Sequence, residues 1–60
     1  MSKNDYRLFF ALFIKFIKLH PFLKESKISQ ATFSRFLNYP GKYDMFISID
    51  KLHTLYDAAL

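Results

Sequence analysis

"FLKESKISQATFSRFLN", residues 22–38, is the stretch that decides the fold, because it predicts two short helices joined by a tight turn. We expect the first helix over residues 22–27, a turn over residues 27–28, and a second helix that begins after Ser29. The Ser29 hydroxyl can accept a hydrogen bond from a backbone amide in the first turn of that helix. The apolar residues that keep helical spacing, and so predict its buried side, are Ile28, Phe33, Phe36 and Leu37.

The opposite side of this second helix is polar, and the chain after it changes direction. The residues expected on the outside are Gln30, Ala31, Ser34 and Arg35. Residues 38–41, Asn-Tyr-Pro-Gly, are typical of a turn and end the helix. A loop is expected over 42–47, with a brief extended piece over 45–47. Ser48 then caps a last helix that carries Asp50 in its first turn. The predicted core residues of this last helix are Ile49, Leu52, Leu55, Tyr56 and Leu60.

Residues 6–19 predict a first helix that is unusually apolar. Asn4 or Ser2 can cap it, and Asp5 lies favourably near its positive end. At about 100° per residue, the polar side falls within about 80° of arc. The residues on that polar side are Arg7, Ala11, Lys15 and Lys18. The rest of the arc is about twice the width that one core contact needs. Pro21 should end this helix or open the next one at its first turn.

Length and composition indicate one small all-α domain of four helices spanning residues 1–60. There is no Cys, so neither disulfides nor thiolate metal sites can support the fold. Hydrophobic residues make up 52% of the chain, more than a globule of this size can easily hide. This excess raises the odds of a homodimer or of a partner protein. The net charge of +4 suits a polyanion or an anionic surface, although solubility alone would also explain it.

The apolar first helix predicts neither a membrane span nor a signal peptide. Its longest uncharged run, Leu8 to Ile14, is far shorter than the roughly 20 residues that cross a bilayer. No small-residue cleavage site follows it. We therefore expect a cytoplasmic protein.

The stretch of residues 22–38 resembles the helix-turn-helix of the lambda repressor and Cro family. In that family a Ser, here Ser29, commonly opens the recognition helix, and a motif like Ser-Arg-Phe-Leu-Asn often closes it. "SIDKLHTLYDAAL", residues 48–60, is similar to the family's following helix, so the resemblance covers roughly residues 19–60. It implies a helix-turn-helix domain that binds duplex DNA without a cofactor, as a small transcriptional regulator or repressor that occupies an operator. Such small regulators are typical of mobile elements.

The resemblance also implies roles for individual residues. Gln30 stands where the first side chain of the recognition helix reads a base. Arg35 matches a position that faces the DNA backbone or a guanine, and Asn38 matches a phosphate-holding position at the helix end. The residues placed around Gln30, against a thymine methyl or a phosphate, are Ala31, Thr32 and Ser34. The lysines that can hold flanking phosphates, unless they are ordinary surface lysines, are Lys24, Lys27 and Lys42.

Several features depart from the family pattern. Lys27 replaces the Gly that is usual in the turn, where a left-handed backbone is expected. Leu19 stands where the family often has a Gln that braces the reading residue. The loop over residues 39–47 is longer than usual, and no fifth helix, a frequent dimer element, follows the fourth.

The broad apolar arc of the first helix predicts an interface. We expect a homodimer through it. The alternative is a protein-interaction module or inhibitor that docks this helix on a partner protein, and a weaker alternative is a membrane-surface peptide. One side of the arc carries Leu8, Leu12, Phe16 and Phe9, and the other carries Phe13, Ile17, Phe10 and Ile14. One side packs on the domain, and the sequence leaves open which one. The residues assigned to the interface are Phe9, Phe10, Phe13, Ile14, Phe16 and Ile17.

Neither catalysis nor metal binding is expected. His20 and His53 are far apart in the sequence and have no Cys to complete a metal site. Asp50, His53 and Asp57 share a helix face, but a solvated surface explains that spacing better than an active site.

Overall fold

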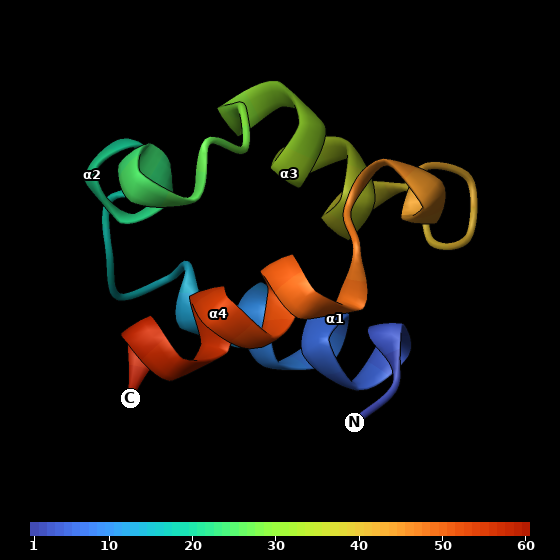
Figure 1. Ribbon diagram of the computed structural model, residues 1–60, viewed down its shortest axis with the longest axis horizontal. Helices are drawn as coiled ribbons and strands as arrows, with labels where there is room; N and C mark the ends of the chain where they lie inside the picture. Colours follow the sequence, from blue (N-terminus) through green and yellow to red (C-terminus); the bar gives the residue numbers. More distant parts are fainter.

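The computed structural model describes the backbone of all 60 residues and every side chain except those of His20 and Glu25. Four α-helices and two short 3-10 helices follow one another, and this confirms the predicted all-α fold with four helices. The elements in chain order are α1 (Lys3–Phe13), α2 (Leu19–Leu23), η1 (Lys24–Ser26), α3 (Gln30–Asn38), η2 (Asp44–Phe46) and α4 (Ile49–Ala59). In Figure 1, α2 and α3 lie above α1 and α4, so the molecule has two layers.

The start of α1 is fixed by a capping box between Ser2 and Asp5. The Ser2 hydroxyl accepts a hydrogen bond from the Asp5 amide (3.2 Å), and the Ser2 amide donates to the Asp5 carboxylate (2.9 Å). The bond from the Ser2 backbone is the largest cause that lowers the pKa of Asp5. Of the two predicted caps, Ser2 and Asn4, the structure therefore selects Ser2.

The end of α1 was predicted wrongly. The helix stops at Phe13 rather than near residue 19, and Lys18 is extended. The chain turns back here because Phe22 packs on Phe10 and Phe13, with ring centroids 6.1 and 5.4 Å apart. Pro21 lies in the first turn of α2, where its missing amide hydrogen leaves no helical bond unmade. The helix predicted over residues 22–27 consequently begins earlier and is divided into α2 and η1.

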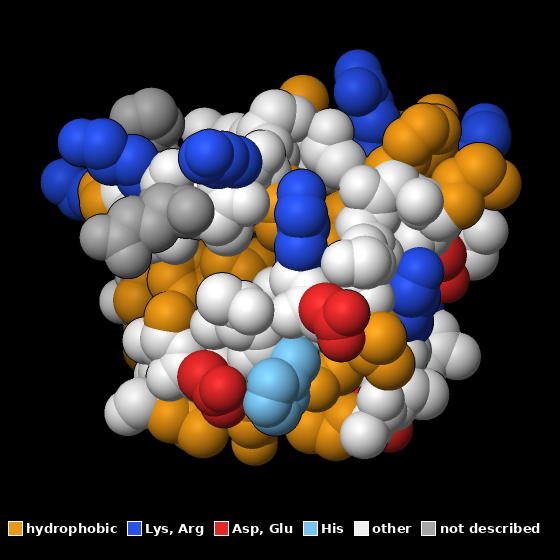
Figure 2. Space-filling view, viewed as in Figure 1, with side chains coloured by type: hydrophobic (Ala, Val, Ile, Leu, Met, Phe, Trp, Pro, Cys, Tyr) orange, Lys and Arg blue, Asp and Glu red, His pale blue; other side chains and the backbone are white. Residues whose placement is uncertain are grey.

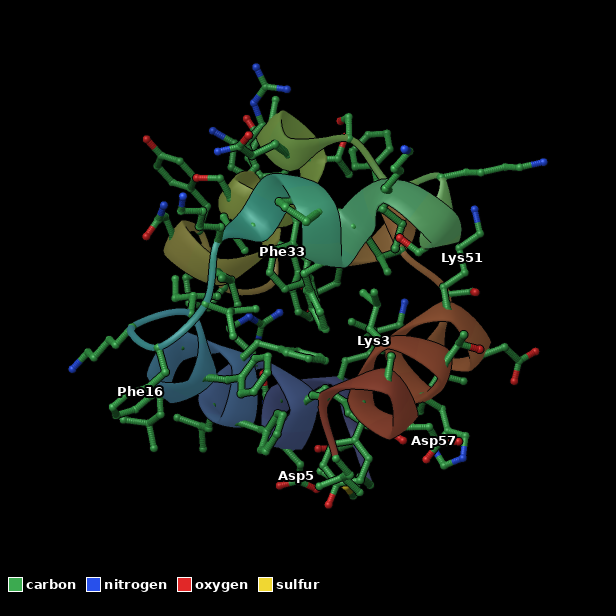
Figure 3. All side chains as sticks on the ribbon, turned by 90° about the vertical axis from the view of Figure 1, so that its left-hand side faces the viewer. Lys3, Asp5, Phe16, Phe33, Lys51 and Asp57 are labelled. Atoms are coloured by element: carbon green, nitrogen blue, oxygen red, sulfur yellow. The ribbon has the colours of Figure 1, made fainter. Side chains whose placement is uncertain are left out.

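The core lies between the two layers. Phe33 and Phe36 of α3 are fully buried, as predicted, and Phe33 meets Phe10 edge to face with centroids 5.3 Å apart. Figure 3 shows Phe33 pointing from the upper layer towards the lower one. The buried apolar residues are Tyr6, Phe10, Leu23, Ile28, Phe33, Phe36, Ile47, Leu52 and Leu55.

The prediction for α4 was confirmed only in its middle. Leu52 and Leu55 are buried and Tyr56 is half-buried, whereas Ile49 and Leu60 are exposed. These two residues lie in the first helical position and at the C-cap, so they extend beyond the part of α4 that the other helices cover.

Arg7 was assigned to the polar outside of the first helix, and this assignment was wrong. Its side chain is in the core, with the residue only 6% exposed, and it connects three parts of the chain. Its Nε donates to the carbonyl oxygen of Phe36 (2.9 Å), and its terminal nitrogens bond the side chains of Asn4 and Asp44. The guanidinium also lies 4.4 Å from the centre of the Phe36 ring.

The bond from Arg7 gives the Phe36 carbonyl group a donor that the end of α3 cannot supply. A helix leaves its last carbonyl groups without partners, and the residue four positions after Phe36 is Pro40, which has no amide hydrogen to donate. Arg7 supplies that donor from another helix. A helical wheel could not reveal this role, because it depends on where α3 ends in space.

The loop after α3 is also not as predicted. Residues 44–46 form the 3-10 helix η2 rather than an extended piece, and only Ile47 is extended and buried. Asp44 holds this segment, because its carboxylate pairs with Arg7 and accepts from the Gly41 amide (3.1 Å). Lys3 adds a bond from its Nζ to the Asp44 carbonyl oxygen (2.7 Å).

Asp44 should make the stability of the fold depend on acidity. The hydrogen bond from Arg7 is the largest cause that lowers the pKa of Asp44, and burial opposes it. In the unfolded chain this carboxyl has a pKa of about 4. Its stabilising effect is therefore complete above about pH 4 and is lost as the pH falls through the lower pKa of the folded state. We expect the melting temperature of Asp44→Asn to fall less than that of the parent chain between neutral and strongly acidic pH.

Circular dichroism melts at several pH values measure this difference. Asp50→Asn, at an exposed position in the first turn of α4, is the matched control and should keep the acid sensitivity of the parent chain. An Asp44→Asn variant whose melting temperature falls as steeply as that of the parent would contradict the assigned role of the Arg7–Asp44 pair.

Candidate nucleic-acid interface

A turn of three residues joins η1 to α3. Lys27 has a left-handed backbone (φ 60°, ψ 24°), so lysine occupies here the conformation that glycine adopts more easily. The Ser26 hydroxyl supports the turn by donating to the Leu23 carbonyl (2.7 Å) and accepting from the Ile28 amide (3.4 Å). Ile28 then enters the core and fixes the direction of the chain into α3.

The predicted cap of α3 is confirmed. The Ser29 hydroxyl accepts from the Thr32 amide (3.1 Å) and donates to the Thr32 hydroxyl (2.8 Å). At the other end of the helix, the Asn38 amide donates to the Ser34 hydroxyl (3.1 Å). These four side chains therefore form two hydrogen-bonded pairs, one near each end of α3.

Gln30, Ala31 and Arg35 are exposed, as predicted, and Ser34 is half-buried. Phe33 and Phe36 hold the opposite side of the same helix in the core. The exposed side of α3 therefore presents an amide, a methyl group and a guanidinium on a helix that its neighbours fix in place.

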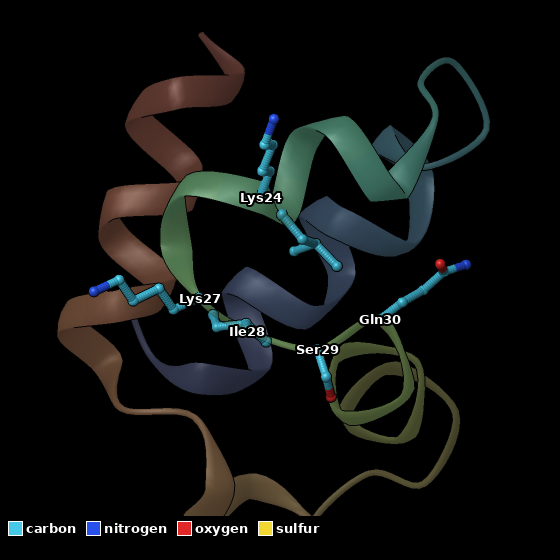
Figure 4. A pocket seen from close by; sticks show the side chains of 6 residues that line it. Lys24, Lys27, Ile28, Ser29 and Gln30 are labelled. Carbon is cyan, nitrogen blue, oxygen red and sulfur yellow. The ribbon is translucent and has the colours of Figure 1, made fainter.

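Two of the predicted phosphate-holding lysines, Lys24 and Lys27, lie beside the start of α3. Together with Gln30 they border a shallow pocket of about 410 Å³, whose floor includes Leu23 and Ile28. Figure 4 shows the side chains of Lys24, Lys27 and Gln30 extending outwards from this pocket in different directions. In Figure 2 the Lys and Arg side chains lie mainly over the layer of α2 and α3, and the acidic ones lie lower. Lys42, the third predicted lysine, is in the loop after α3.

The residues assigned to an interface on the first helix are not all available for one. Phe10 is fully buried in the core, so its assignment was wrong. Four of the assigned side chains are half-buried: Phe9, Phe13, Ile14 and Ile17. The first three of these pack against the core. Phe16 is 83% exposed and is the assigned residue with the freest surface.

The assigned interface set left out two exposed apolar residues of α1, although they share one side of the predicted apolar arc with Phe16 and Phe9. Leu8 and Leu12 are 68% and 63% exposed and lie one helical turn apart. With Phe16 in the turn beyond α1, they form what we call the α1 apolar face (Leu8, Leu12 and Phe16). Tyr6, Phe10 and Phe13 are spaced four and three residues apart, which is the spacing of one buried helix side. Leu8 and Leu12 do not share this spacing, so they fall outside the buried side.

His53 is an exposed residue of α4 whose ring contacts α1 through Tyr6. Its Nδ1 is 2.9 Å from the Tyr6 hydroxyl, and its Nε2 is 3.3 Å from a carboxylate oxygen of Asp57. Asp50 lies one turn earlier on the exposed start of α4. The side chain of His20, the other histidine considered as a metal ligand, lies outside the described residues.

Comparison with protein-family models, with curated proteins and with solved structures finds no match to this chain. None of the helices described is long and apolar enough to cross a lipid bilayer.

Proposed function

We propose that this chain binds duplex DNA as a helix-turn-helix regulator, with the exposed side of α3 in the major groove. The observation that carries the proposal is the exposed position of Gln30, Ala31 and Arg35 on a helix anchored by two buried phenylalanines. An element that enters a groove must present side chains outwards and stay rigid while it does so. Occupation of an operator in this way is the simplest route to a repressor.

The exposed groups of α3 have the chemistry that reads base edges. A Gln amide both donates to and accepts from adenine, a guanidinium makes two bonds to guanine, and a methyl group contacts thymine. Gln30, Arg35 and Ala31 supply these three groups in order. The amide groups at the start of α3, beside Ser29, suit a phosphate oxygen.

The groups around α3 suit the DNA backbone. Lys24 and Lys27 flank its N-terminal end, and Lys42 follows its C-terminal end. Asn38 and Thr32 add polar groups at the two ends of the helix. Contacts of this kind fix the register on DNA and give binding that weakens with salt.

Gln30→Ala tests the assignment of the reading helix. On a site selected from random duplexes, we expect this change to weaken binding by about 1–3 kcal/mol, with little change on unrelated DNA. Fluorescence anisotropy on both duplexes measures the difference. Equal weakening on both would show that Gln30 does not read a base.

Lys24→Ala is the matched comparison, because Lys24 is proposed to hold a phosphate. We expect it to weaken binding to all sequences alike. The slope of log affinity against log salt concentration should fall by about one, because one counterion fewer is released. If Lys24→Ala weakened only the selected site, the division between phosphate contacts and base contacts would be wrong.

The α1 apolar face supports a second part of the proposal, a homodimer. Leu8 and Leu12 lie one helical turn apart, and both are more than half exposed, as is Phe16 just beyond the helix. Large apolar side chains that stay exposed on one element suit an interface. A second copy would cover this face and would offer a second α3 to an adjacent major groove. The rival function, docking of α1 on a different protein, uses the same face.

Light scattering at micromolar concentration separates these possibilities. We expect a dimer that Leu12→Lys converts to a folded monomer, since Leu12 is exposed and its replacement leaves the core intact. A parent chain that is strictly monomeric would contradict the homodimer. It would favour a foreign protein or a membrane surface as the partner of the α1 apolar face.

A further inference from the structure

The loop that follows α3 carries a row of aromatic rings that the core does not need. Tyr39, Tyr43 and Phe46 lie side by side, with centroids 5.8 Å apart for the first pair and 6.0 Å apart for the second. Phe46 is 62% exposed, while its neighbour Ile47 is the residue that enters the core. We call this row the aromatic loop (Tyr39, Tyr43 and Phe46).

Lys42 provides a positive charge beside the aromatic loop. The Lys42 ammonium lies 5.7 Å from the centre of the Tyr43 ring and 6.0 Å from that of Tyr39. Asp44, the acidic residue within the loop, is paired with Arg7. In Figure 2 the end of the molecule over this loop shows apolar side chains next to Lys or Arg side chains.

A small pocket connects the aromatic loop to the exposed side of α3. It has a volume of about 140 Å³ and is lined by Thr32, Arg35, Tyr43 and Phe46. Two of these residues belong to the helix proposed to enter the groove, and two belong to the loop. Any DNA that engages Arg35 would therefore bring its sugar-phosphate chain close to the two rings.

We propose that this pocket takes one unpaired nucleotide of a DNA strand, whose base stacks on Phe46 and Tyr43. Lys42 then faces a phosphate beside the stacked base, and Arg35 stays on the neighbouring base pair that it is proposed to read. Exposed aromatic rings beside cations have little to offer a fully paired backbone, but they are the groups on which free bases stack. The same cations argue against a basic or apolar peptide as the occupant. The inference rests on the proposed DNA binding and adds a preference for DNA with an accessible base.

Two labelled probes test the inference by fluorescence anisotropy: a fully paired duplex, and the same duplex with one unpaired thymine. We expect the parent chain to bind the second probe more tightly. Phe46→Ala should remove that preference, a loss of about tenfold on the probe with the unpaired base, and leave the paired duplex unchanged. Met45→Ala is the matched control, because Met45 is 80% exposed in the same loop but does not line the pocket.

Circular dichroism of each variant shows that it is folded, which the exposure of both side chains favours. Equal affinity of the parent chain for the two probes would overturn the inference and leave the proposed duplex binding intact. Equal weakening of both probes by Phe46→Ala would also overturn it, because the ring would then act on paired DNA. Binding of the probe with the unpaired thymine without binding of the paired duplex would support the pocket and contradict the proposed duplex reading.

Discussion

Arg7→Met should lower the free energy of unfolding by about 3 kcal/mol, the lower end of the range for breaking a buried ion pair. The change keeps the apolar stem but leaves the carbonyl of Phe36 without its donor and Asp44 without its cation. We expect the lower end of the range because the Asp44 side chain is 27% exposed, so water partly solvates the charge that the substitution leaves unpaired. Urea unfolding followed by circular dichroism measures the loss.

Arg35→Met is the matched control for this prediction, because it makes the same chemical change on the exposed side of α3. We expect it to change stability by less than about 0.5 kcal/mol. The double variant Arg7→Met with Asp44→Asn should be less destabilised than the sum of the single changes, since no unpaired charge remains. Equal effects of Arg7→Met and Arg35→Met would contradict the buried position of Arg7.

Phe36→Ala should lower the free energy of unfolding by about 3–5 kcal/mol, because Phe36 is fully buried and alanine leaves a cavity. That loss is comparable with the whole stability of a domain of this size. The variant should therefore be largely unfolded at room temperature, which circular dichroism shows directly. Phe16→Ala removes the same ring from an exposed position and should leave the fold intact. A Phe36→Ala variant that melts like the parent would refute the register of α3, and with it the outward position of Gln30 and Arg35.

Local signals in the sequence predicted α3 and the start of α4 well. Ser29 and Ser48 each accept a hydrogen bond from an amide three residues later, so each cap is decided by residues that are neighbours in the chain. The spacing of Phe33 and Phe36 also determined which side of α3 is buried. Such features depend on residues that are close together in the chain, so they can be predicted from the sequence.

The errors occurred where distant parts of the chain meet. Arg7 is polar, so its position on the wheel suggested solvent, but the carbonyl that needs it lies 29 residues away. The early end of α1 depends on Phe22 returning to pack against Phe13. The pocket beside the aromatic loop likewise joins Arg35 to Phe46 through the path of a loop that the sequence predicted as irregular. Neither periodicity nor capping residues indicate contacts of this kind.

The central claim is that the face of α3 binds duplex DNA, and the most direct measurement is anisotropy of a labelled random duplex titrated with the purified chain. We predict binding at about 50 mM salt that weakens about 40-fold at about 200 mM, as expected when three phosphate-holding cations release counterions. The three cations are Lys24, Lys27 and Lys42. No binding at the lower salt concentration, or binding that does not change with salt, would contradict the account.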